Sequence, residues 1–173
     1  PFATIINANA GTVNVAGTVT LRTPSGGNFA DVRGTFAYTG TNQNIASAQY
    51  GNLTLSGTSP NFLAAAEYLV GGNLTGAATP DFGAASLVQY NGAGTQTVAA
   101  FTYELLKFSA AGTKEISGTV TANASTMATT AVDIVSTGSP TVSVLSGGQL
   151  NITTGTLSNV ATLNFNSGTS TIG

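Results

Sequence analysis

Residues 50–57 read Tyr-Gly-Asn-Leu-Thr-Leu-Ser-Gly, and residues 103–109 read Tyr-Glu-Leu-Leu-Lys-Phe-Ser. In both stretches, apolar residues stand three and five positions after the tyrosine, with one polar residue between them. Side chains of a strand point alternately to opposite faces, so this spacing predicts a strand with one buried face. The two stretches lie 53 residues apart.

The similarity extends on both sides of the two strands, over residues 36–75 and 87–121. The pairs that match at the same offset are Gln43/Gln96, Ile45/Val98, Tyr50/Tyr103, Leu53/Leu106, Leu55/Phe108 and Ser56/Ser109. Each copy is followed by a Gly-x-Leu/Val-Thr element, at residues 72–75 and 118–121. We interpret this as a degenerate internal repeat of about 53 residues.

Short alternating runs closed by Gly, Asn or Ser recur along the whole chain. They stand at residues 13–15, 19–21, 36–38, 53–55, 132–134, 142–144, 150–152 and 163–165. A unit of several short strands cannot cover its own apolar face and must stack on its neighbours. We therefore expect an all-β, right-handed parallel β-helix, or β-solenoid, with bends rich in Gly, Asn and Thr. Coils of roughly 20–25 residues would give seven or eight turns, with two coils per repeat unit.

The chain is expected to form a single β-solenoid segment over residues 1–173 and to be part of a longer chain. Two stretches complicate this prediction because they hold helix-forming residues. Residues 101–108 align with the strand at 50–55 and are predicted to be strand. Residues 62–70 read Phe-Leu-Ala-Ala-Ala-Glu-Tyr-Leu-Val, and here helix and strand both remain open.

The repeated pattern of Tyr-x-Gly, Gln-x-Ile/Val, Tyr-x-x-Leu-x-Leu/Phe-Ser and Gly-x-Leu/Val-Thr resembles repeats of very large secreted surface proteins from Bacteroidetes and Chlorobi-type bacteria. In those repeats, the strand is often followed by Gly-Thr-Lys, as at residues 112–114. The first copy departs from that pattern, with Thr58-Ser59-Pro60 in its place. The resemblance implies a β-helical stalk or adhesin-like segment at the cell surface, with no catalytic residues.

Composition excludes several classes of function. The chain has no Cys and no His, so it has neither a zinc site of the usual kind nor a catalytic triad built on histidine. Its four basic residues are too few to neutralise a nucleic-acid backbone. The longest nearly apolar run has nine residues, too short to span a membrane. Only 6% of residues are charged, and this uncharged surface favours an extracellular location.

Candidate sites for chemistry are sparse. The six carboxylates do not occupy matched positions of the repeat: they are Asp31, Glu67, Asp81, Glu104, Glu115 and Asp133. Glycoside hydrolysis needs two carboxylates within reach of each other, and calcium-binding repeats need a regular Gly-Gly-x-Gly-x-Asp phrase, which is missing. We therefore predict no catalytic residue, no metal site and no cofactor.

The tyrosines of the two copies suggest one binding surface. If Tyr38, Tyr50, Tyr90 and Tyr103 were exposed, they would form a strip able to contact surface glycans, although a buried or edge-packing ladder explains them better. Our main hypothesis is a structural or adhesive extracellular segment, a rigid stalk or filament that associates head to tail. The alternatives are a glycan-binding module with a Tyr strip and a carbohydrate-active β-helix enzyme.

Overall fold

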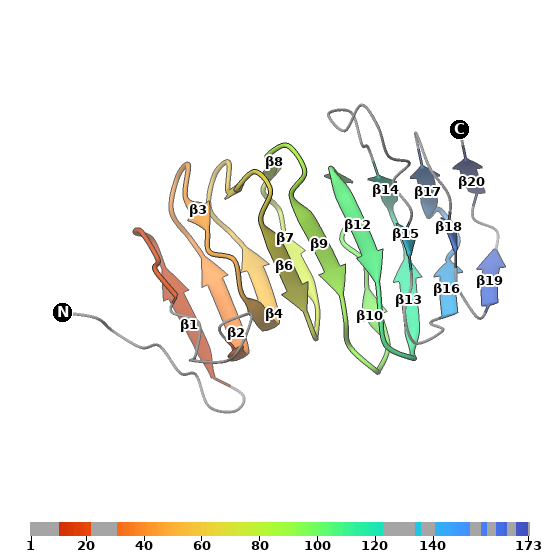
Figure 1. Cartoon of the computed structure of the whole chain (residues 1–173), viewed down its shortest axis with the longest axis horizontal. Coiled ribbons are helices and arrows are strands. Elements are labelled where there is room, and N and C mark those ends of the chain that lie inside the picture. The colour runs from red at the N-terminus through yellow and green to blue at the C-terminus, as the bar shows by residue number, and fades with distance from the viewer. Residues whose placement is uncertain are drawn as a thin grey trace.

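All regular secondary structure in the described residues is β-strand, as expected. The computed structural model describes residues 11–21, 31–122, 134–135, 141–152, 157–158, 162–165 and 169–172. Every strand pair in them is parallel, and the chain winds as a β-solenoid. Figure 1 shows the strands stacked side by side along the long axis, from β1 near the N-terminal end to β20. No helix long and apolar enough to cross a membrane occurs in the described part of the chain.

Each turn contributes strands to three faces. The first face contains β6 (Glu67–Val70), β9 (Leu87–Tyr90), β12 (Leu105–Phe108), β15 (Ile134–Val135) and β18 (Leu157–Ser158). The second contains β1 (Thr12–Val15), β7 (Leu74–Gly76), β10 (Gln96–Thr97), β13 (Thr113–Ile116), β16 (Thr141–Val144) and β19 (Thr162–Phe165). The third contains β3 (Asn44–Ile45), β5 (Asn61–Phe62), β8 (Asp81–Phe82), β11 (Thr102–Tyr103), β14 (Thr119–Ala122), β17 (Gln149–Ile152) and β20 (Thr169–Ile172). Two long strands, β2 (Asp31–Tyr38) and β4 (Gln49–Leu55), bend from the first face to the second.

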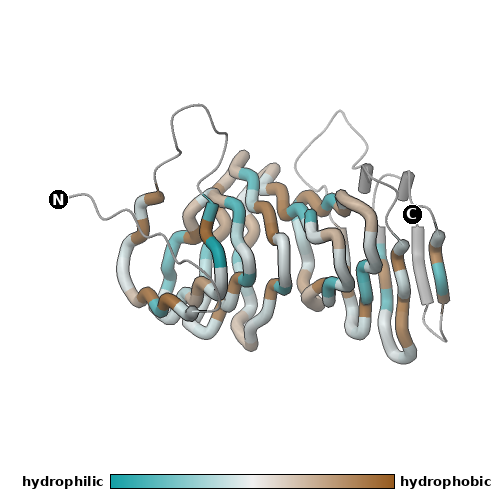
Figure 2. Tube along the Cα trace, turned by 90° about the horizontal axis from the view of Figure 1, so that it is seen from below, coloured by the Kyte–Doolittle hydropathy of each residue, from teal (hydrophilic) through white to brown (hydrophobic). Residues whose placement is uncertain are grey.

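The core consists of columns of side chains that point inward at the same position of successive turns. One column on the first face runs Val32, Tyr50, Val70, Tyr90 and Phe108, and all five side chains are buried. Each inward side chain is sheltered by the one above and the one below, so burial depends on stacking between turns. Figure 2 shows the turns side by side, with apolar segments recurring along the axis.

Turn length is uneven along the solenoid. Val88 lies 20 residues after its partner Tyr68 and 18 residues before its partner Leu106. The step from Lys114 to its partner Val142 is longer, at 28 residues. With β2 and β4 included, the second face holds eight strands in the described residues, which agrees with the expected seven or eight turns.

Residues 62–70 form strands and not a helix. Phe62 ends β5, and Glu67 begins β6. Between them, Ala65 adopts a φ of 53°, which no α-helix accommodates. Its N–H bonds to Ala84 O of the next turn at 2.8 Å, so the corner is held by stacking and overrides the local helix preference.

Most of the predicted runs are strands, and two need comment. Residues 19–21 lie outside any strand, although Val19 and Leu21 still pack against the core. Within the run at 132–134, only Ile134 belongs to the described residues. The strand predicted at 101–108 is confirmed as β11 and β12, with Glu104 at the corner between them.

Candidate functional site

The repeat copies build the same buried hydrogen-bond circuit. In the first copy, Ala46 N donates to Tyr38 Oη at 2.9 Å, and Tyr50 Oη donates to Ala46 O at 2.5 Å. The two hydroxyls are 2.9 Å apart, which closes the circuit. The backbone N–H and C=O of Ala46, at a corner of the solenoid, are thus both hydrogen-bonded, each to the phenol of a different strand.

The second copy repeats this arrangement around Ala99. Ala99 N donates to Tyr90 Oη at 3.0 Å, Tyr103 Oη donates to Ala99 O at 2.8 Å, and the hydroxyls are 2.8 Å apart. Desolvation raises the pKa of Tyr90 to about 12 and that of Tyr103 well above its ordinary value. Both phenols therefore stay protonated at neutral pH and act as hydrogen-bond groups.

The repeat unit was expected to be two coils long, but it is longer than two coils. Tyr50 lies on the first face, and its column reaches Tyr90 two turns later. Tyr103 lies two faces further on, in β11 of the third face. The second copy is therefore displaced by two turns and two of the three faces, and the same corner is built at a different edge of the solenoid.

The four tyrosines cannot form the exposed strip that the glycan-binding alternative required. Their side chains are completely buried, with 0% exposure: Tyr38, Tyr50, Tyr90 and Tyr103. They also do not stack on one another as a ladder, because Val70 separates Tyr50 from Tyr90 in the column. The buried interpretation of these tyrosines is confirmed, and a glycan contact at them is contradicted.

A buried glutamine braces each copy. Gln43 Oε1 accepts from Gly40 N at 2.9 Å, and Gln96 Oε1 accepts from Gly92 N at 2.8 Å. Their amide nitrogens donate to backbone oxygens of the preceding turn, Gly17 O and Gly72 O, and Gln96 Nε2 also donates to Val70 O at 2.8 Å. These contacts join successive turns inside the core.

Lys114 is a buried cation whose burial was not predicted from the sequence. It is completely buried, and its Nζ donates to Gly92 O and Gln96 Oε1, both at 2.6 Å. Desolvation lowers its pKa to about 8, and no ion pair to it occurs in the described residues. The alternation of the strand could have predicted this burial, because Lys114 lies two residues before Ile116 and therefore on the same, inward face. In the first copy, Asn61 stands 53 residues earlier, at the corresponding position.

The carboxylates are spread over the solenoid. Glu67 is paired with Leu87, Asp81 with Asn61, and Glu115 with both Thr97 and Ser143, so none of these three stands opposite another carboxylate. Asp31 pairs with Arg33 at 3.0 Å on the surface. No cluster of three potential metal ligands occurs among the described residues, and Asp133 lies outside them.

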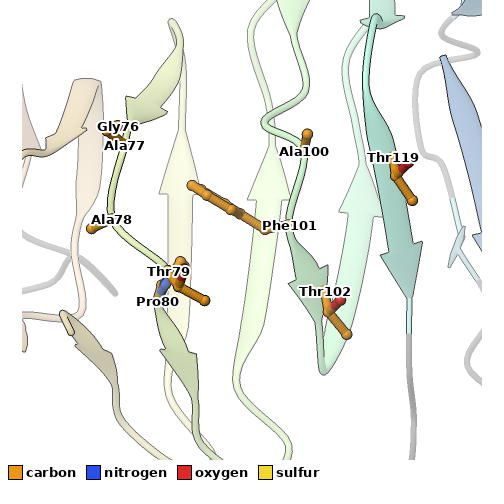
Figure 3. A pocket seen from close by; sticks show the side chains of 9 residues that line it. All are labelled: Gly76, Ala77, Ala78, Thr79, Pro80, Ala100, Phe101, Thr102 and Thr119. Atoms are coloured by element: carbon orange, nitrogen blue, oxygen red, sulfur yellow. The ribbon is translucent and has the colours of Figure 1, made fainter. Parts of the chain in front are cut away.

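An open groove of about 500 Å³ lies where two faces are interrupted. Its lining consists of Gly76, Ala77, Ala78, Thr79, Pro80, Ala100, Phe101, Thr102 and Thr119. No strand pairing joins β7 to β10 or β8 to β11, so the second and third faces both break at this level. Figure 3 shows Phe101 reaching across the groove toward the 76–80 segment. The groove could not be predicted from the sequence, because it arises where strands of neighbouring turns do not pair.

Comparison with protein-family models, curated proteins and solved structures finds no match to this chain.

Proposed function

We propose that the chain is a rigid structural segment of an extracellular surface protein, a stalk or spacer whose turns also associate end to end. The observation that carries this proposal is the core itself, because inward columns run from turn to turn and their last described member is partly exposed. Phe165 follows Ile116 and Val144 in one such column. Those two are fully buried, whereas Phe165 is 45% exposed.

The first described turn is partly exposed as well. Val13 and Val15 stand in the columns that continue into Phe36 and Tyr38, yet both valines are only partly buried. A further parallel turn, from this chain or from a second copy, would cover these apolar side chains. Little charge opposes such contact, since only ten residues are charged.

The spacer role follows from the geometry of stacking. Each turn advances the chain by about 4.8 Å along the axis, so length grows in proportion to the number of turns. Backbone ladders along the axis and buried side chains across it make each turn depend on its neighbours. Adhesion, the extracellular location and the absence of catalysis are parts of the same proposal.

End-to-end association is tested by sedimentation velocity over a range of concentrations, together with negative-stain electron microscopy. We expect the chain to form rods that lengthen with concentration, and Phe165→Lys to shift the population to monomer by placing a charge at the exposed position of its column.

Leu63→Lys is the matched control for that experiment. Leu63 is 44% exposed, nearly the same as Phe165, but it lies at a lateral corner next to β5. We expect this variant to assemble like the parent chain. A parent chain that stays monomeric at every concentration, or two variants that behave alike, would contradict end-to-end association.

A further inference from the structure

The groove between the 76–80 segment and β11 has a fixed aromatic side. The Phe101 ring is half-buried, and its centroid lies 6.3 Å from that of Phe82 and 6.1 Å from that of Tyr103. Tyr103 is in turn held in the hydrogen-bond circuit of the second repeat copy. The ring is therefore positioned by buried neighbours while part of it borders the groove.

Hydroxyl groups from three successive turns line this groove. Thr79 precedes β8, Thr102 begins β11, and Thr119 begins β14, and all three residues are exposed. Each hydroxyl both donates and accepts a hydrogen bond. Figure 3 shows Thr79 across the groove on the side to which the Phe101 ring points, and Thr119 on the strand beyond the 100–102 segment, where its hydroxyl donates to Gln149 Oε1 at 3.4 Å.

The charge of the lining residues and the length of the strand edges beside the groove limit the class of ligand that fits. None of the nine lining residues is ionisable, so the groove offers no partner for an acidic glycan or a charged peptide. The unpaired edges that border it, β8 and β11, are two residues each. Such short edges offer an incoming peptide strand few backbone hydrogen bonds.

We propose that this groove binds a neutral sugar, with one pyranose ring packed against Phe101 and its hydroxyls bonded to Thr79 and Thr102. A pyranose presents an apolar C–H face and a rim of hydroxyls, which matches one aromatic surface flanked by a few placed polar groups. The site is independent of the proposed stalk role, because it lies on the side of the solenoid and away from its ends.

The test is a titration followed by ¹⁵N–¹H NMR on the whole chain. The probes are neutral hexasaccharides of glucose, mannose, galactose and N-acetylglucosamine, with a galacturonate hexasaccharide and a neutral Gly-Thr hexapeptide for comparison. We expect at least one neutral sugar to shift the amide signals of residues 76–79, 100–102 and 119. The galacturonate oligomer and the peptide should leave them unchanged.

Two variants separate loss of binding from loss of folding. Phe101→Ala should weaken binding about tenfold or more, whereas Leu63→Ala should not. Thr102→Arg, at an exposed rim position, should abolish binding with the fold kept, whereas Thr12→Arg on β1 should bind normally. The proposal is overturned if no neutral sugar shifts these signals, if the shifts lie elsewhere, if the peptide alone binds, or if folded Thr102→Arg binds like the parent.

Discussion

Gly92→Ala is expected to lower the free energy of unfolding by at least about 3 kcal/mol and the melting temperature by roughly 10 °C. A Cβ at Gly92 would stand 2.0 Å from Gly71 O of the preceding turn and 2.8 Å from Gln96 Cδ. The oxygen belongs to backbone, so relief requires the two turns to separate. Gly92 N and Gly92 O also hold Gln96 and Lys114, so the whole brace would be displaced.

Gly94→Ala is the matched control, two residues along the same corner. A Cβ at Gly94 would meet no atom within 4 Å, and we expect stability to change by less than about 0.5 kcal/mol. Denaturant and thermal unfolding, followed by circular dichroism, measure both variants. Equal stabilities of Gly92→Ala and Gly94→Ala would mean that the turns do not approach each other at this corner as described.

The second large effect is a rise in stability with pH on the alkaline side. The pKa of Lys114 is about 8 in the folded chain against an ordinary 10.5. Between these values the unfolded chain binds the additional proton, so the free energy of unfolding increases as pH rises. We expect Lys114 to contribute a gain of about 2 kcal/mol from pH 8 to pH 10, measured as the difference in the free energy of unfolding between the parent chain and Lys114→Met. As pH falls through 8, this contribution is fully lost.

At higher pH the sign reverses because of the tyrosines. Tyr68 and Tyr90 have pKa values raised to about 12, so they remain protonated in the folded chain while the unfolded phenols ionise near 10. Five tyrosines have raised pKa values, so their opposing contribution begins below pH 10, and the total stability should pass through a maximum between about pH 9 and pH 10.

Lys114→Met should remove the rise above pH 8 but keep the decline at higher pH. Lys107→Met, on the outward side of β12, should leave the whole profile unchanged in shape. Urea unfolding at intervals of half a pH unit measures these profiles. If the difference in stability between the parent chain and Lys114→Met stayed constant from pH 8 to 10, Lys114 would not keep its lowered pKa in a buried site.

The fold class could be predicted from the sequence because side chains alternate between inward and outward positions, and turns stack on their neighbours, in the same way along the whole solenoid. At Leu53 and Leu55, a spacing of two predicted inward side chains, and both are fully buried. The repeat also located the paired tyrosines and glutamines that form the two circuits. The ambiguity at 62–70 could not be resolved locally, because Ala65 takes its corner conformation from a bond to the next turn.

Other features could not be predicted without knowing which residues of successive turns are paired. The displacement of the second copy by two turns and two faces depends on unequal turn lengths, which no pattern within one turn reveals. Exposure of the tyrosines was undetermined because alternation assigns a side chain to a face without saying which face is inside. The groove beside Phe101 depends on an interruption between β8 and β11, a property of two strands distant from each other in the sequence.

Disulfide cross-linking tests the parallel stack most directly, because the chain has no cysteine of its own. Thr54 and Thr75 are partners in register with their Oγ1 atoms 3.2 Å apart, and Gln89 and Lys107 are partners two faces away from them along the chain. The double variants Thr54→Cys/Thr75→Cys and Gln89→Cys/Lys107→Cys should each oxidise to an intramolecular disulfide, whereas Thr54→Cys/Lys107→Cys should not. Failure of both register pairs, or cross-linking of the mismatched pair with equal efficiency, would contradict a solenoid of stacked parallel turns.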